Sequence, residues 1–195
     1  TASDLEVDSA VLVKNGDAPM LAYNRISSLG NYRVHVRRWN GSGWPLYGGP
    51  PLNIDPAKSA TEPTLVVDSS GHPIVAWTEE VPANSHVYYG RKVFVKRWNG
   101  SGWDMLGTSG IANASRPHLA MGENGQLVLA YRKCVAGRSQ CTNEDLYVAR
   151  WERDSIASAY TWKVIGQTLE VNAAATVYSL QLAVHNNQPV VAWNE

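Results

Sequence analysis

The sequence predicts an all-β fold built from repeated units of four antiparallel strands. Short apolar runs bounded by Gly, Asn, Asp and Ser recur along the chain, which is typical of short strands joined by tight turns. The runs also repeat at a fixed spacing, because Tyr23, Trp77 and Tyr131 stand 54 positions apart in equivalent runs. Four strands in a repeat of this length favour the blade of a β-propeller over the unit of a solenoid.

The clearest copy of the unit spans residues 61–107. Its predicted strands, called a, b, c and d from first to last, are 63–67, 73–78, 93–98 and 103–106. Turn residues Ser69, Ser70 and Gly71 separate strand a from strand b, and the stretch 99–102 (NGSG) separates c from d. Asn-Gly supplies the positive φ angles that a tight hairpin needs.

Three further copies cover most of the remaining chain. Residues 9–47 form the first blade, 116–166 the third, and 177–195 hold only strands a and b of a fourth. In the third copy the c–d turn has grown from NGSG to ERDSIASAYT. The sequence therefore predicts one partial β-propeller with three complete four-stranded blades plus an a–b hairpin of a fourth.

The predicted c strands carry bulky side chains on both faces. In the second copy Val93 and Val95 point to one face, whereas Phe94 and Trp98 point to the other. Blades that pack against a neighbour on each side require this pattern.

The units resemble the degenerate blade repeats of secreted bacterial propellers, of the general form PxLxVDxxGxPxVAW...VYVxRWNGxxW. The resemblance implies the fold but no single activity, since such propellers include binding scaffolds, lectins and glycan-cleaving enzymes. The stretch 68–71 (DSSG) is similar to the Asp-box of sialidases. That box joins the third and fourth strands of a blade, whereas here the stretch joins a and b, so no sialidase residues are carried over.

Charge and motifs exclude several classes of function. Seventeen Lys and Arg residues balance seventeen Asp and Glu residues, so we expect no nucleic-acid partner and no anionic-membrane partner. No apolar run approaches the roughly 20 residues of a membrane span, so membrane insertion is not expected. The chain has no H-E-x-x-H, P-loop or G-x-S-x-G motif, and its five His residues show no ligand spacing. The sequence therefore predicts neither a metal nor a cofactor.

The two cysteines indicate the compartment. Cys134 and Cys141 lie seven positions apart in one predicted loop, a span that can close as a local disulfide. Two free thiols in a cytosolic protein are the alternative. A disulfide would place the chain in an oxidising environment, which is extracellular, at the cell surface or periplasmic.

The fourth unit stops after its strand b, which runs from Pro189 to Trp193. An unpaired apolar edge strand is an aggregation hazard that natural proteins avoid. We therefore expect further blades at this edge, either from the same longer chain or from partner chains.

The b–c and d–a loops of a propeller emerge on one face, and here they are long and differ in every copy. Variable loops on a rigid scaffold are the usual place for binding residues. The b–c loops are predicted at 24–33, 78–92 and 132–145, and the d–a loops at 48–62, 108–116 and 166–178. The candidate ligand-binding residues at the ends of successive b strands are Asn24, Arg25, Glu79, Glu80, Arg132 and Lys133. Solvated loop charges are the alternative interpretation.

Two sets of residues recur in every complete copy. Trp44, Trp103 and Trp162 lie on the predicted outer strands and are candidates for exposed stacking on sugar rings. Arg38, Arg97 and Arg150 each precede the tryptophan of a c strand. Their recurrence favours a structural hydrogen bond over an anion site.

The leading hypothesis is a non-enzymatic extracellular binding or scaffold propeller that recognises protein or glycan through the b–c and d–a loop face. A second hypothesis is a carbohydrate-active enzyme with part of its site outside this chain. In that case Glu79 or Glu80 would act as general acid or base, and Arg25 or Arg132 would clamp a carboxylate. A third is a structural subunit of an extracellular assembly. No catalytic residue is assigned.

Overall fold

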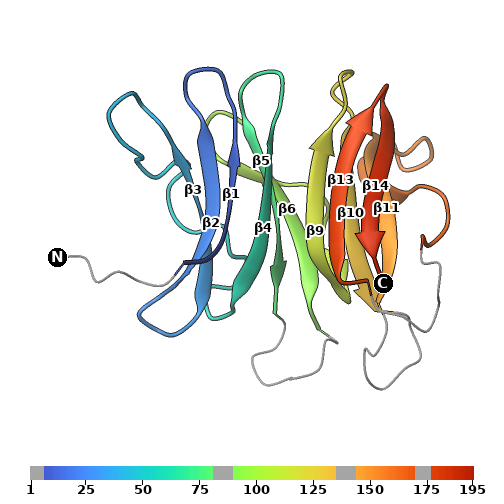
Figure 1. Ribbon diagram of the computed structural model, residues 1–195, viewed down its shortest axis with the longest axis horizontal. Helices are drawn as coiled ribbons and strands as arrows, with labels where there is room; N and C mark the ends of the chain where they lie inside the picture. The colour runs from blue at the N-terminus through green and yellow to red at the C-terminus, as the bar shows by residue number, and fades with distance from the viewer. Residues whose placement is uncertain (1–6, 81–89, 135–143, 170–176) are drawn as a thin grey trace.

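The computed structural model describes residues 7–80, 90–134, 144–169 and 177–195 (Figure 1). Within these ranges the regular structure consists of β-strands, and every pairing between strands is antiparallel. The strands form four separate sheets that follow one another along the chain.

The first sheet has the order β1 (Val7–Val13), β2 (Met20–Ile26), β3 (Tyr32–Arg38). The second has the order β4 (Ala60–Val67), β5 (Pro73–Glu79), β6 (Lys92–Trp98), β7 (Trp103–Met105), with β8 (Ile111–Ala112) also paired to β6. The third has the order β9 (Ala114–Met121), β10 (Leu127–Cys134), β11 (Glu144–Arg153), β12 (Tyr160–Val164). The fourth contains β13 (Ser179–His185) and β14 (Gln188–Asn194).

The predicted strands of the second copy coincide with β4 to β7 to within three residues at each end. The first sheet differs, because its fourth strand is not regular. Residues 45–47 run beside β3 through two backbone hydrogen bonds, from Arg38 N to Pro45 O (3.3 Å) and from Tyr47 N to Val36 O (2.8 Å). Pro45 has no N–H to donate, which explains why the pairing remains an isolated bridge.

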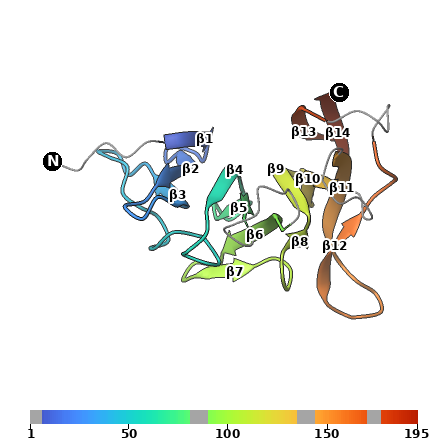
Figure 2. The same ribbon diagram turned by 90° about the horizontal axis from the view of Figure 1, so that it is seen from below.

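The four sheets fan out into an arc, which Figure 2 shows from below. The first strand of each sheet lies on the concave side, where β4 contacts β1 and β9, and β9 contacts β13. We call β1, β4, β9 and β13 the inner strands. The last strands, such as β7 and β12, lie on the convex side. Among the described residues β14 pairs only with β13.

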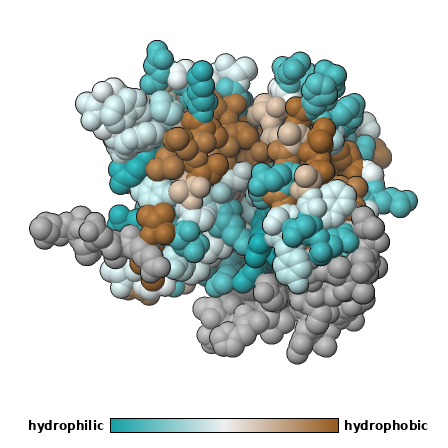
Figure 3. Space-filling model, in the orientation of Figure 1, coloured by the Kyte–Doolittle hydropathy of each residue, from teal (hydrophilic) through white to brown (hydrophobic). Residues whose placement is uncertain are grey.

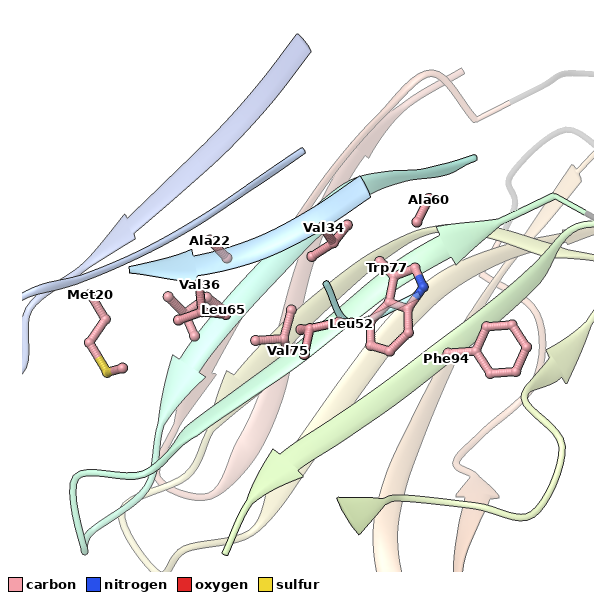
Figure 4. Packing of buried hydrophobic residues seen from close by; sticks show 10 residues of the cluster. All are labelled: Met20, Ala22, Val34, Val36, Leu52, Ala60, Leu65, Val75, Trp77 and Phe94. Carbon is pink, nitrogen blue, oxygen red and sulfur yellow. The ribbon is translucent and has the colours of Figure 1, made fainter. Parts of the chain in front are cut away.

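The hydrophobic core is divided into three clusters, one between each pair of consecutive sheets. In the first cluster Trp77 and Phe94 of the second sheet pack against Met20, Val34 and Val36 of the first sheet (Figure 4). Trp77 is fully buried, and its ring centroid lies 6.0 Å from that of Phe94. Burying a large apolar side chain stabilises the fold by about 1.5–3 kcal/mol. Packing between sheets therefore holds the arc together.

Candidate functional site on the inner strands

The inner strands of the second and third sheets contain the same β-bulge near their start. In β4 the register shifts between Thr61 and Thr64. In β9 it shifts between Ser115 and His118, which pair with Arg132 and Ala130 of β10. The bulged residues Glu62 and Arg116 have φ angles of 55° and 50°. Each precedes a proline, which cannot donate to the ladder and so breaks the pairing there. Left-handed backbone at a residue other than glycine costs on the order of 1 kcal/mol or more, and it concentrates at functional sites.

Glu62 and Arg116 interact with each other across the two sheets. Glu62 Oε2 accepts hydrogen bonds from Thr78 Oγ1 (2.7 Å) and from Arg116 N (3.0 Å). Glu62 Oε1 lies 3.4 Å from Arg116 Nε. Arg116 Nη1 also donates to Tyr178 O (3.1 Å), next to the start of β13. The pair therefore connects three consecutive sheets at the concave side.

A groove of about 490 Å³ runs along the inner strands at this point. Its polar and aromatic lining includes Ser9, Glu62, Thr64, Arg116, His118 and Tyr178. We call it the inner groove. Figure 3 shows hydrophilic residues toward the end where the inner strands start, and hydrophobic residues toward the a–b turns. The side chains of Glu62 and Arg116 remain 31% and 48% exposed, and Tyr178 is 61% exposed. These groups are thus accessible to a ligand.

His118 and Asp8 add to the polar end of the inner strands. Burial lowers the pKa of His118, although the negative charge of Glu62 opposes the shift. His118 is therefore neutral near pH 7 and can donate or accept a hydrogen bond. Asp8 lies 54 positions before Glu62, and Glu62 lies 54 positions before Arg116. The pairing of β1 with β2 is also irregular beside Asp8. Asn24 Nδ2 donates to Asp8 Oδ2 at 3.3 Å.

Three of the six residues predicted at the ends of the b strands are buried. Glu79 is 1% exposed. Its carboxylate accepts hydrogen bonds from Asp55 N (2.8 Å), Ile54 N (2.9 Å) and Trp77 Nε1 (3.0 Å). Glu79 therefore holds the loop after the first sheet against β5, and burial removes it from reach of a ligand.

Asn24 and Arg132 are also buried and bonded within the protein. Asn24 Oδ1 accepts a hydrogen bond from Ser9 N (2.8 Å), and Asn194 Oδ1 makes the same bond with Ser179 N in the fourth sheet. Arg132 forms an ion pair with Glu144 and donates to Val177 O. These bonds tie down the starts of inner strands and neighbouring segments.

The other three candidates are partly exposed. Arg25 lines a shallow pocket with Arg33 and His35 at the end of the first sheet. Glu80 lies 3.8 Å from Arg91, and Lys133 Nζ lies 5.8 Å from the centre of the Tyr147 ring. None of these three residues lines the inner groove.

The three tryptophans predicted as exposed stacking surfaces, Trp44, Trp103 and Trp162, are each half-buried. Trp103 Nε1 donates to Gly48 O (3.1 Å), and Trp162 Nε1 donates to Leu106 O (2.9 Å). Each bond reaches the preceding sheet, so these half-buried indoles join neighbouring sheets. Trp44 packs against Trp39, with ring centroids 5.6 Å apart.

The recurring arginines make different contacts in each sheet. Arg97 pairs with Asp68, and Arg150 Nη2 donates to Gln188 Oε1 of the fourth sheet at 3.2 Å. The guanidinium of Arg38 lies over the ring of Tyr47. They do not share one anion site.

Three other expectations concern disulfide, metal and membrane. Cys134 ends β10 and is buried, whereas Cys141 lies outside the described residues, so their disulfide stays a prediction. The described ranges contain no group of three or more His, Cys, Asp or Glu side chains suited to a metal ion. In the same ranges no helix is long and apolar enough to span a bilayer.

Comparison with known proteins identifies the fold. No protein-family profile and no curated protein matches the chain. A protein of unknown function from Dyadobacter fermentans is similar over 97% of this chain and 62% of its own, with a TM-score of 0.66 and 13% identity. An α-L-arabinanase from Penicillium chrysogenum, complexed with arabinobiose, is similar over 94% and 57%, with a TM-score of 0.57 and 16% identity. An endo-arabinase from Bacteroides thetaiotaomicron is similar over 100% and 78%, with a TM-score of 0.54 and 12% identity.

The fold is a β-propeller. The four sheets are its blades 1 to 4, and the fourth is present here as a hairpin. The chain spans less than two thirds of the first two structures. At such low identity the likeness concerns the fold alone.

The residues selected from the sequence do not include those that line the inner groove. Glu62, Arg116 and Tyr178 are the last residues of the three predicted d–a loops. They therefore lie at the starts of a strands, whereas the candidates chosen from the sequence lie at the ends of b strands. A usable signal was present, because two charged residues that each precede a proline recur 54 positions apart.

Proposed function

We propose that this chain is a non-enzymatic extracellular binding propeller that recognises a glycan in the inner groove. The observation that carries the proposal is the combination of an exposed aromatic ring, Tyr178, with the exposed ion pair of Glu62 and Arg116 in one groove. Sugar sites combine an aromatic surface for the apolar face of the ring with a few fixed polar groups for the hydroxyls. The arabinobiose in the Penicillium arabinanase structure supports a test with arabinan.

Each residue has a distinct part in this proposal. Tyr178 supplies the stacking surface, and Arg116 donates to sugar oxygens. Glu62 accepts from a hydroxyl, while its bonds to Thr78 and Arg116 keep the carboxylate in place. Neutral His118 completes the set as a donor or an acceptor. Because the ion pair already holds these polar side chains in position, they lose less conformational entropy when a ligand binds.

The test is retardation of the purified chain in native gels that contain soluble arabinan. Tyr178→Ala removes the stacking ring, and Glu62→Gln removes the negative charge that holds Arg116 in place. Each variant should weaken retardation at least tenfold. Glu80→Gln is the matched control, because Glu80 is a partly exposed acid outside the groove. Circular dichroism confirms that each variant is folded. If both groove variants migrate like the parent chain, the proposal is wrong.

A carbohydrate-active enzyme is the second candidate. One observation favours it, namely that Asp8 and Glu62 stand at corresponding positions of adjacent inner strands. Most glycosidases use two carboxylates, so this pair offers an acid and a base or nucleophile. The enzyme would release reducing sugars from arabinan, and both Asp8→Asn and Glu62→Gln would abolish the release. Binding without any release supports the first candidate.

We also propose that the edge of β14, from Pro189 to Trp193, meets further blades, either of a longer chain or of a partner chain. Its backbone groups on one side have no strand partner among the described residues. Light scattering combined with a denaturing gel tests this. A larger polypeptide supports further blades in one chain, and a multimer of this chain supports the structural-subunit hypothesis. A stable monomer of 21.4 kDa would contradict both.

A further inference from the structure

A second pocket lies between blades 2 and 3, and it shares no residue with the inner groove. Its volume is about 460 Å³, within the range of about 300–1,000 Å³ that is typical of small-ligand sites. The lining that matters here consists of Asp68, Arg97, Leu106, Trp151 and Tyr160. We call it the interblade pocket. Asp68 comes from the a–b turn of blade 2, Arg97 and Tyr160 lie close to c–d turns, and Leu106 follows β7.

The pocket exists because the residues at two positions, Leu106 and Tyr160, differ from those at the joint between blades 1 and 2. At that joint the rings of Tyr47 and Trp98 make a T-shaped contact, with centroids 5.5 Å apart. Leu106 follows Tyr47 by 59 positions and takes its place at the next joint, facing Trp151. Because leucine is smaller than tyrosine, space opens in front of the tryptophan.

The long c–d turn of blade 3 brings a second aromatic ring to this space. Tyr160 opens β12 immediately after the turn, and its ring stacks on Trp151 with an interplanar angle of 23°. Asp154 holds the turn by accepting hydrogen bonds from Ile156 N (2.8 Å) and Ala157 N (2.7 Å). The ring of Trp151 also packs against Trp162, with centroids 5.3 Å apart. The result is a cluster of three aromatic rings in which Tyr160 is 61% exposed.

The polar side of the pocket is an ion pair with unused donors. Asp68 Oδ2 accepts from Arg97 Nη2, and Oδ1 accepts from Ser70 N and His72 N, both at 2.9 Å. Burial alone would raise the pKa of Asp68, but these bonds lower it, so the carboxylate is ionised at neutral pH. The side chain of Arg97 is 47% exposed, and its Nε and Nη1 have no hydrogen-bond partner among the described residues. Arg97 can therefore donate to a ligand.

We propose that the interblade pocket is a second ligand site that binds one neutral sugar ring. The apolar face of the ring stacks on Tyr160, and its oxygens accept hydrogen bonds from Arg97. A neutral sugar fits better than a uronate, because the charges of Arg97 and Asp68 cancel and leave no net attraction for a carboxylate. Aromatic stacking together with donors at a fixed position is the chemistry that carbohydrate rings require. The site does not depend on ligand binding in the inner groove.

The test uses native gels that contain arabinan, galactan, xyloglucan or polygalacturonate, with the full chain. Tyr160→Ala should reduce retardation by at least one of the three neutral polymers fivefold or more, and Arg97→Ala should weaken the same interaction. Tyr160→Phe keeps the ring and should behave like the parent chain. Ile156→Ala is the matched control, since Ile156 lies in the same turn, is 94% exposed and does not line the pocket.

The outcomes separate this site from the inner groove. If Tyr160→Ala loses retardation and Tyr178→Ala does not, the result supports the interblade pocket alone. If Tyr178→Ala loses retardation and Tyr160→Ala does not, the interblade proposal is overturned and the inner-groove proposal stands. Retardation by polygalacturonate only would overturn the assignment to a neutral sugar. Absence of retardation of the parent chain by all four polymers would overturn the proposal. Tryptophan fluorescence during titration gives a second readout, because a ligand on Tyr160 alters the surroundings of Trp151.

Discussion

The indole nitrogen of Trp103 lies 3.1 Å from the carbonyl oxygen of Gly48 and donates a hydrogen bond to it across the joint between blades 2 and 1. Trp162 makes the equivalent bond to Leu106 across the next joint, at 2.9 Å. Gly48 has a φ of 79°, and a Cβ atom at this position would overlap the Trp103 indole. The joint therefore requires glycine for two independent reasons, its backbone conformation and the space that the indole occupies.

We expect Gly48→Ala to lower the free energy of unfolding by about 2–4 kcal/mol. About 1 kcal/mol comes from the positive φ angle, and the remainder comes from displacement of the indole. Gly49→Ala is the matched control, since Gly49 has a φ of 84° but a methyl group on its Cα would meet no atom within 4 Å. Urea unfolding monitored by tryptophan fluorescence measures both variants. Equal losses would show that the contact with Trp103 adds nothing to the cost.

Glu79 and Glu80 are neighbours in sequence with opposite surroundings, so they allow a direct comparison. Glu79→Gln replaces one acceptor oxygen with a donor, which leaves at least one of the N–H groups of Ile54, Asp55 and Trp77 without a partner. An unsatisfied buried group costs about 1–3 kcal/mol. Glu80→Gln should change stability by less than about 0.5 kcal/mol, because its ion pair with Arg91 is exposed.

Unfolding curves of the two glutamine variants decide between a structural and a ligand-binding role for Glu79. If Glu79→Gln weakens arabinan binding without any loss of stability, the structural assignment is wrong.

The disulfide between Cys134 and Cys141 can be tested chemically. Under denaturing conditions without reductant neither cysteine should react with iodoacetamide, and both should react after reduction. Intact-protein mass spectrometry distinguishes these states. Alkylation of both residues without reductant would show free thiols and would remove the main argument for an oxidising compartment.

The fold was predictable because each blade repeats the same local signals. The stretch Asn99 to Gly102 closes its hairpin through Asn99 Oδ1, which accepts hydrogen bonds from Ser101 N (2.9 Å) and Gly102 N (2.8 Å). Residues 40–43 form the same turn. Such bonds link residues two or three positions apart, so composition and order suffice to foresee them. The irregular fourth strand of blade 1 depends on one proline, Pro45, which the repeat pattern concealed.

The candidate site was less predictable because burial depends on packing between blades. Glu79 looked like an accessible acid at a strand end, yet the loop at Ile54 and Asp55 covers it from 24 or more positions away. Trp103 looked like an outer aromatic, but its partner Gly48 belongs to another blade. Conversely, the role of Glu62 follows from contact with Arg116, 54 positions later. A contact between residues so far apart can be foreseen only from the repeat, in which Glu62 and Arg116 each precede a proline at a spacing of 54 positions.

His35 gives the last prediction, because it stands where Phe94 and Tyr147 stand in the next two blades, each opposite the aromatic residue of strand b. Its ring stacks on Tyr23 at 5.5 Å, and its buried Nδ1 has no hydrogen-bond partner within the part of the chain that the structure describes. Burial lowers the pKa of His35 to about 4, with further contributions from the charges of Arg25, Arg37 and Arg33. A phenylalanine would repeat the pair of Trp77 and Phe94 without the cost of protonation.

The pH dependence follows from this depressed pKa. The unfolded state binds the proton with a pKa of about 6.5, so between about pH 6.5 and about pH 4 the unfolded chain carries more protons than the folded one. Stability from this group is complete above that window and is lost as the pH falls through it. After allowance for partial exposure, the loss is about 1–2 kcal/mol. His35→Phe should therefore flatten the dependence of urea unfolding on pH between 7 and about 4.5, while His118, also depressed, accounts for the remaining slope. Parallel curves for parent and variant would show that His35 titrates normally in the folded protein.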